Sequence, residues 1–183
     1  MPVQALSLQA FAFGKLPTHG DFVARGLPAA EREAWDAWSS AGLQAARETL
    51  GEAFEARHDA ARPLRFAFGP GPFGTGWRAG VVAASIDTAG RRFVIVLGAR
   101  AAGALPPDGV GGAVAETAEE AVYRAFETAA DIDAAVLSAQ DDFQTMESIA
   151  ESESEGRFWL PDSSLDIVAC QPPADLITRV MTL

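Results

Sequence analysis

The sequence predicts an α/β fold in which helices pack on both faces of one central sheet. Amphipathic helical patterns precede and follow a group of extended segments. One of these, Arg91–Gly98, contains five consecutive apolar residues, where a strand with one face in water would alternate. The chain has 183 residues, 49% of them hydrophobic, which suffices for one sizeable core and is too few to expect two. We therefore expect a single domain over residues 1–183.

The first long helix is predicted over Pro28–Thr49 and continues, directly or as a second helix, to about His58. Pro28 suits a first helical position, because proline has no N–H to leave unpaired there. Apolar and small residues recur every three or four positions and form one face of the helix. They are Trp35, Trp38, Gly42, Ala46, Leu50 and Ala53.

A β-hairpin is predicted next. Asp87–Gly90 is a four-residue turn that ends in glycine, and the extended segments Ala79–Ile86 and Arg91–Gly98 flank it. A shorter strand, Leu64–Phe68, precedes them. The rest of the chain is expected to hold a loop at 101–112, helices over Ala113–Ala130 and Asp131–Ser148, an exposed acidic loop within Glu147–Gly156, strands over Arg157–Leu160 and Leu165–Cys170, and a last helix over Pro173–Met181.

The charge is strongly acidic and unevenly distributed. The net charge is −11, which argues against nucleic acid or an anionic membrane surface as a partner. Residues 93–183 carry 16 acidic and 4 basic side chains, whereas residues 1–92 are nearly balanced. Two interpretations stay open: a solvated surface that maintains solubility, or an acidic face that meets a basic partner.

Composition also indicates the compartment. No apolar run approaches about 20 residues, so no membrane insertion is expected. The start of the chain lacks a basic region and a clear cleavage site, so no secretory signal is expected. The one cysteine, Cys170, lies in an apolar run and is predicted to be a buried, inert thiol. These features predict a cytoplasmic protein.

Signals for catalysis and cofactors are weak. Gly69–Gly74 matches G-x-G-x-x-G, but two prolines remove N–H donors and a strand is expected to follow, so a turn is favoured over a dinucleotide loop. His19 and His58 are far apart in sequence, and Asp21 with Asp36 is one of many possible carboxylate pairs. We expect no catalytic residue, no metal and no cofactor.

One polar segment needs another explanation. FGKLPTHGDFVARGLP, Phe13–Pro28, concentrates charged side chains between glycines and prolines. It is either a tight turn shaped by these residues or a recognition loop on a rigid scaffold. The polar residues are Lys15, His19, Asp21 and Arg25, and the turn-forming residues are Gly14, Pro17, Gly20 and Gly26.

This segment and two others form a specific combination. The others are WDAW at Trp35–Trp38 and RFAFGPGPFGTGWRAGVVAASIDTAGRRF at Arg65–Phe93. Together they supply G-K-L-P-x-x-G-D-F, W-D-x-W and S-x-D-x-x-G-R, and they closely resemble the TagF family, also called ImpM-like, of bacterial type VI secretion accessory proteins. The resemblance is strong over Phe11–Phe93 and looser beyond, where GRFWLPDSS is similar to a tryptophan-bearing strand of the family. The chain departs from the family pattern at Ala84 and at Val94–Ile95, which replace a proline and a Pro-Leu pair.

The resemblance implies a single domain with a mainly antiparallel sheet, and a regulator in place of an enzyme. TagF-like proteins restrain assembly or firing of the secretion machine after translation and are linked to its forkhead-associated scaffold protein, Fha. The expected partner-binding residues are Lys15, His19, Asp21, Arg25 and Asp36. The expected structural motif residues are Gly14, Pro17, Gly20, Trp35, Trp38, Asp87, Gly90 and Arg91.

Two other functions stay open at this point. The chain is alternatively a structural or assembly component of the secretion machine, or a domain that senses a small ligand. Sedimentation with the assembled machine would indicate the former, and a ligand-dependent rise in melting temperature the latter.

Overall fold

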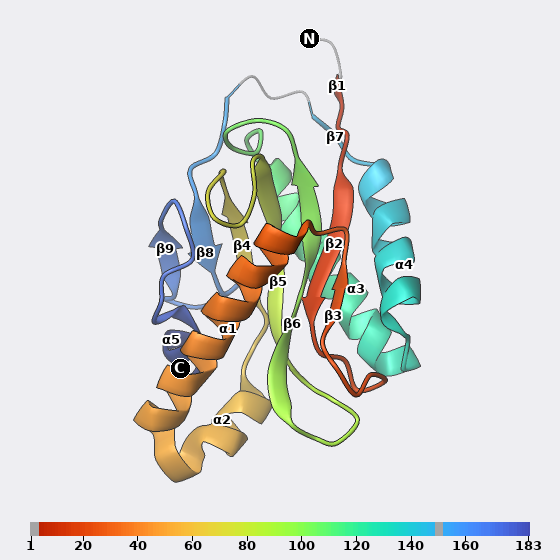
Figure 1. The fold of residues 1–183 in the computed structure, drawn as a ribbon. Helices are drawn as coiled ribbons and strands as arrows, with labels where there is room; N and C mark the ends of the chain where they lie inside the picture. Colours follow the sequence, from red (N-terminus) through yellow and green to blue (C-terminus); the bar gives the residue numbers. More distant parts are fainter. Residues whose placement is uncertain (1–3, 149–151) are drawn as a thin grey trace.

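The computed structural model describes residues 4–148 and 152–183, and Figure 1 shows their arrangement. Seven strands form one sheet in the order β3-β2-β6-β5-β4-β8-β9, and every neighbouring pair is antiparallel. The strands are β1 (Gln4–Ala5), β2 (Gln9–Gly14), β3 (Val23–Arg25), β4 (Leu64–Phe68), β5 (Trp77–Ile86), β6 (Arg92–Ala101), β7 (Glu147–Ser148), β8 (Arg157–Trp159) and β9 (Asp166–Val168). The helices are α1 (Ala29–Leu50), the 3-10 turn η1 (Gly51–Ala53), α2 (Phe54–Ala60), α3 (Val110–Thr128), α4 (Ile132–Gln144) and α5 (Leu176–Met181). Strands β1 and β7 pair separately.

Helices cover both faces of the seven-stranded sheet. α3 and α4 lie on one face, while α1, α2 and α5 lie on the other (Figure 1). Strand β6 lies inside the sheet, and its residues 93–99 are all buried. The predicted α/β fold with a two-sided sheet is confirmed, and so is the mainly antiparallel arrangement that the resemblance implied.

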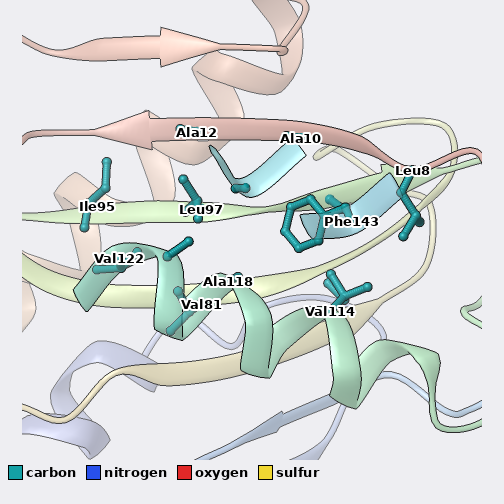
Figure 2. Packing of buried hydrophobic residues seen from close by; sticks show 14 of the residues in the cluster. Leu8, Ala10, Ala12, Val81, Ile95, Leu97, Val114, Ala118, Val122 and Phe143 are labelled. Atoms are coloured by element: carbon teal, nitrogen blue, oxygen red, sulfur yellow. The ribbon is translucent and has the colours of Figure 1, made fainter. Parts of the chain in front are cut away.

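The two faces of the sheet pack differently. Under α3 the core is aliphatic: Val114, Ala118 and Val122 face the β5–β6 hairpin (Figure 2). Under α1 the core is aromatic, and the buried Trp35 ring lies 4.7 Å from Phe73 between ring centroids. Such ring pairs stabilise a core beyond the area they bury.

The long helix begins at Ala29, one residue after the predicted start. Pro28 is its N-cap, and the buried face of α1 carries Trp35, Gly42 and Ala46 as expected. The indole Nε1 of Trp38 donates a hydrogen bond of 3.1 Å to the carbonyl of Pro173, which fixes α1 to the segment before α5. Both tryptophans of W-D-A-W therefore have structural contacts.

Other predicted elements occur with shifted ends. β4 has the predicted bounds, and the hairpin is longer than expected at its open end. α3 begins at Val110, inside the expected loop, and α4 ends at Gln144, before the acidic stretch. Strands β2 and β3 were not predicted, because β3 is only three residues long and lies inside the polar segment, and β2 runs into the start of that segment.

The expectation for Cys170 was wrong, because its side chain is exposed. It follows β9, the last strand of the sheet, where Asp166 and Val168 also face solvent. Side chains alternate across a strand, so a residue two positions beyond Val168 continues on the outward side. The apolar run indicated burial, but an edge strand has only one covered face.

Part of the expected acidic loop, residues 149–151, lies outside the described residues. Of the remainder, Glu153 and Glu155 are exposed, as expected. The backbone of Ser154 donates to the carbonyl of Pro106 at 2.9 Å, which attaches this segment to the loop before α3.

Candidate functional site

Residues 15–22 of the polar segment form a loop between β2 and β3 that lies against residues 87–90, the turn of the β5–β6 hairpin; we call this loop and the turn together the loop site. Two hydrogen bonds to backbone carbonyls join them: Thr88 N–H donates to His19 O at 3.0 Å, and the Arg91 guanidinium donates to Gly20 O at 3.0 Å. Pairing of β2 with β6 explains this, because Gly14 lies opposite Ile95 and the chain enters the loop beside the hairpin. Two sequence motifs that are far apart in the chain thus form one site.

A buried carboxylate, that of Asp87, organises this site. Its Oδ2 accepts from Lys15 Nζ at 2.8 Å and from Arg91 Nε at 2.6 Å. Its Oδ1 accepts from the backbone N–H groups of Ala89 and Arg91, at 3.0 and 2.9 Å. A buried charge is tolerated only when it is paired and hydrogen-bonded, and Asp87 meets both conditions. We call Lys15, Asp87 and Arg91 the turn cluster.

The turn cluster also fixes the charge state of Asp87. The hydrogen bond from Lys15 acts most strongly, with further hydrogen bonds from the Arg91 and Ala89 backbone and the Arg91 guanidinium. Together they hold the pKa of the Asp87 carboxyl well below its usual range, against the opposing effect of burial. The carboxylate therefore stays ionised at neutral pH.

An exposed aromatic ring covers the turn cluster. Phe22 is 49% exposed and stacks on Phe13 at 5.9 Å, with Phe93 edge-on at 4.7 Å between ring centroids. The Lys15 ammonium lies 4.9 Å from the centre of the Phe22 ring. This is within cation–π range, so one side of the ring is held while the other faces solvent. Phe22 belongs to the G-K-L-P-x-x-G-D-F motif but was not among the residues expected from the sequence to bind a partner.

The loop is also tied to the start of α4. His19 Nε2 accepts the backbone N–H of Ile132 at 3.1 Å, which requires that Nε2 carry no proton. Arg25 forms a two-pronged pair with Asp133, at 2.6 and 3.1 Å. The hydrogen bonding of Arg25 to the Asp133 carboxylate raises the pKa of Arg25, and the pair is exposed. Three of the predicted polar residues, Lys15, His19 and Arg25, therefore hold the loop in place.

The structure separates the remaining predicted residues. Asp21 is exposed at the tip of the loop. Asp36 is exposed on α1, and among the described residues its recorded side-chain partner is Ser40, at 3.4 Å. Asp36 is thus not joined to the loop by any hydrogen bond or ion pair within residues 4–148 and 152–183.

A second charged cluster lies at the other end of the same hairpin. It consists of Glu31 from α1, Arg78 from β5 and Arg100 from β6, and it lines a pocket of about 460 Å³. We call it the pocket cluster. Sequence analysis missed it because the predicted strands began at Ala79 and ended at Gly98, which left both arginines outside the hairpin.

Within the part of the chain that the structure describes, no group of three or more metal-binding side chains is present. In the same part, no helix is long and apolar enough to cross a lipid bilayer.

A comparison with models of known families identifies the family of this chain. The family model for the TagF N-terminal domain, described as type VI secretion system-associated, matches residues 12–152. The chain belongs to the TagF family. The match includes both motifs that form the loop and turn site, and the resemblance identified from the sequence is confirmed.

A solved structure agrees with this assignment. The crystal structure of PA0076 from Pseudomonas aeruginosa PAO1 is similar, with a TM-score of 0.64 and 28% sequence identity. The match covers 95% of this TagF-family chain and 77% of PA0076. A comparison with curated proteins found no match.

Proposed function

We propose that this TagF-family protein represses type VI secretion after translation, acting in the cytoplasm as a binding protein without catalytic activity. Its target in this proposal is a forkhead-associated, Fha-like scaffold of the secretion machine, which it withholds from assembly. The family match supports the link to secretion. Repression and the identity of the scaffold are our extension of that link.

The observation that carries the proposal is the construction of the loop site. Its cationic side chains Lys15, Arg25 and Arg91 are all paired with carboxylates, and Phe22, Asp21 and the hairpin turn are exposed. A catalytic site would instead present a free nucleophile or base in a cleft. A rigid loop with one exposed aromatic ring is typical of a protein contact, where a few aromatic and arginine residues contribute most of the affinity.

Charge supports the same kind of interaction. The acidic C-terminal half includes α3, where Glu116, Glu120 and Glu127 are exposed. An acidic face attracts a basic region of a partner and makes the association rate sensitive to salt. In our proposal this attraction raises the association rate, while the loop site supplies specificity.

The test combines dose, binding and one matched pair of variants. Release of the secreted tube protein should rise on deletion of the gene and fall in a graded way on overproduction, since sequestration requires a repressor concentration comparable to that of its target. Phe22→Ala should weaken binding to the purified scaffold by roughly tenfold or more and relieve repression. Tyr123→Ala is the control, because Tyr123 on α3 is 47% exposed, nearly the same as Phe22.

The outcomes separate the alternatives. If secretion is indifferent to dose, or the purified protein does not bind the scaffold, the repressor proposal is wrong. Stoichiometric sedimentation with the assembled sheath would indicate a structural component instead. Retained repression in Phe22→Ala with unchanged scaffold binding would move the contact away from the loop site.

A further inference from the structure

The pocket cluster lines a pocket that has no role in the proposed repression. Its pocket lies where β5 and β6 end, and it is lined by Ser7, Gln9 and Thr75 in addition to the three charged residues. At about 460 Å³ it falls within the size range of small-ligand sites. This pocket is separate from the loop site and from the proposed scaffold contact.

Two arginines lie side by side in the pocket wall. Arg78 and Arg100 are direct cross-strand partners, so their side chains leave the same face of the sheet. Arg78 is 1% exposed, and burial lowers its pKa to about 10 although Glu31 opposes this effect. Like charges that face each other across two strands are unfavourable. This arrangement therefore needs negative charge to balance it.

Glu31 supplies only part of that charge. Its carboxylate lies 3.2 and 3.3 Å from Arg100 Nη1, and 3.7 Å from Arg78 Nη1, which is too long for a hydrogen bond. Among the residues that line the pocket, all of which are described, it is the one carboxylate. Two guanidinium groups and one carboxylate leave a net positive charge in the pocket wall.

The arginines also have unused hydrogen-bond donors. Arg78 Nη2 donates to the carbonyl of Gly76 at 2.6 Å. The Nε atoms of Arg78 and Arg100 are buried, yet neither has an acceptor among residues 4–148 and 152–183. Buried donors without an acceptor are costly and rare in native proteins. The net positive charge of the pocket wall, with the incomplete hydrogen bonding of its arginines, points to an anion with several oxygens.

The backbone makes room for this cluster. Gly74 has a φ of 139°, and a Cβ built on it would lie 2.5 Å from both Arg78 Nη2 and Glu31 Oε1. A side chain at this position would push the ends of the two charged side chains aside, and the positive φ itself favours glycine.

We propose that this pocket binds a small phosphorylated molecule, with Arg78 and Arg100 as the ligands of its phosphate group. A phosphate monoester offers three terminal oxygens and more negative charge than a carboxylate, which suits two arginine forks. The hydroxyl groups of Ser7 and Thr75 and the amide of Gln9 are further polar groups of the lining. The volume beyond the phosphate accommodates a compact organic part.

The test is calorimetric titration of the purified chain with ribose 5-phosphate, with inorganic phosphate and ribose as comparisons. We expect saturable one-to-one binding of ribose 5-phosphate, weaker binding of inorganic phosphate and none of ribose. Arg100→Gln should weaken binding roughly tenfold or more, since it removes a charge-assisted donor. Arg92→Gln is the matched control: Arg92 lies on the same strand, is also paired with carboxylates, and has a side chain 24% exposed against 27% for Arg100.

Glu31→Gln distinguishes ligand binding from a structural role. It removes the carboxylate that competes for both arginines, so the affinity for inorganic phosphate should rise severalfold. A purely structural cluster would give no such gain. Non-saturable binding, equal losses in Arg92→Gln and Arg100→Gln, or weaker phosphate binding by folded Glu31→Gln would each overturn the proposal.

Discussion

Each end of the β5–β6 hairpin carries a cluster of charged side chains, and the two clusters differ in how completely they are hydrogen-bonded. Each end joins two cationic side chains to one carboxylate: Lys15 and Arg91 to Asp87 at the turn, and Arg78 and Arg100 to Glu31 at the pocket. At the turn the carboxylate receives four hydrogen bonds of 2.6–3.0 Å. At the pocket the separations are 3.2–3.7 Å, and two guanidinium nitrogens have no acceptor among the described residues.

The difference follows from where each carboxylate comes from. Asp87 belongs to the turn itself, so local backbone N–H groups point at it without any further ordering of the chain. Glu31 comes from α1, a separate element, and reaches the arginines across the junction of helix and sheet. Charge composition alone therefore does not distinguish a structural ion cluster from a binding site. What separates them is whether every donor has an acceptor.

The largest effect is expected between the two clusters, where β6 crosses the core. Ile95→Asp should abolish cooperative folding, because an unpaired charge at this fully buried position costs several kcal/mol against a total stability of roughly 5–15 kcal/mol. Ile86→Asp, on the exposed end of β5, is the control and should fold. Thermal unfolding followed by circular dichroism measures both, and a cooperative transition in Ile95→Asp would contradict the two-sided sheet.

The next effect compares the two carboxylates directly. Asp87→Asn should lower the melting temperature by an amount of the order of 10 °C, because it weakens a buried pair and leaves one amide N–H group facing cationic donors. Glu31→Gln should lower it by less than half as much, because its contacts are longer. Differential scanning calorimetry measures both. Equal losses would show that the pocket cluster is as fully satisfied as the turn cluster.

The pH dependence sharpens the same comparison. Since the folded-state pKa of Asp87 is depressed, its contribution is complete above the unfolded-state pKa of about 3.9 and is lost as the pH falls through the folded-state pKa. The difference in melting temperature between the wild type and Asp87→Asn should therefore be constant from pH 7 to about pH 5 and shrink below pH 4. A difference that stays constant down to pH 2 would mean that the turn cluster does not lower the folded-state pKa of Asp87.

The smallest effect is expected at the exposed pair that ties the loop to α4. Arg25→Gln should change the melting temperature by less than about 3 °C, because exposed ion pairs contribute little. Lys15→Met, in the buried turn cluster, should lower it clearly more. If the two variants lower the melting temperature by the same amount, Lys15 does not anchor the loop as the structure indicates.

The structure distinguishes two charged residues of the polar segment. From the sequence, Lys15 and Arg25 were equivalent candidates for partner contact. In the structure Lys15 is buried against Asp87 while Arg25 stays exposed. A lysine in a polar segment gives no sign of its depth, because depth depends on a strand that pairs many residues away.

The sequence by itself determined the elements whose signal is local. Periodic apolar residues predicted α1, an unbroken apolar run predicted a strand covered on both faces, and a turn ending in glycine predicted the hairpin. The motif combination determined the family. Each of these signals lies within a short window, where spacing along the chain corresponds to spacing in space.

Only the tertiary structure decided what the motifs touch. The Lys15–Asp87 pair exists because β2 pairs with β6, and the pocket cluster exists because hairpin register sets Arg78 opposite Arg100 beneath α1. The exposure of Cys170 depends in the same way on β9 being an edge strand. A shift of one residue in register would turn each of these side chains to the other face of the sheet. Register and layer order are settled by packing across the whole domain, so no short window of the sequence contains them.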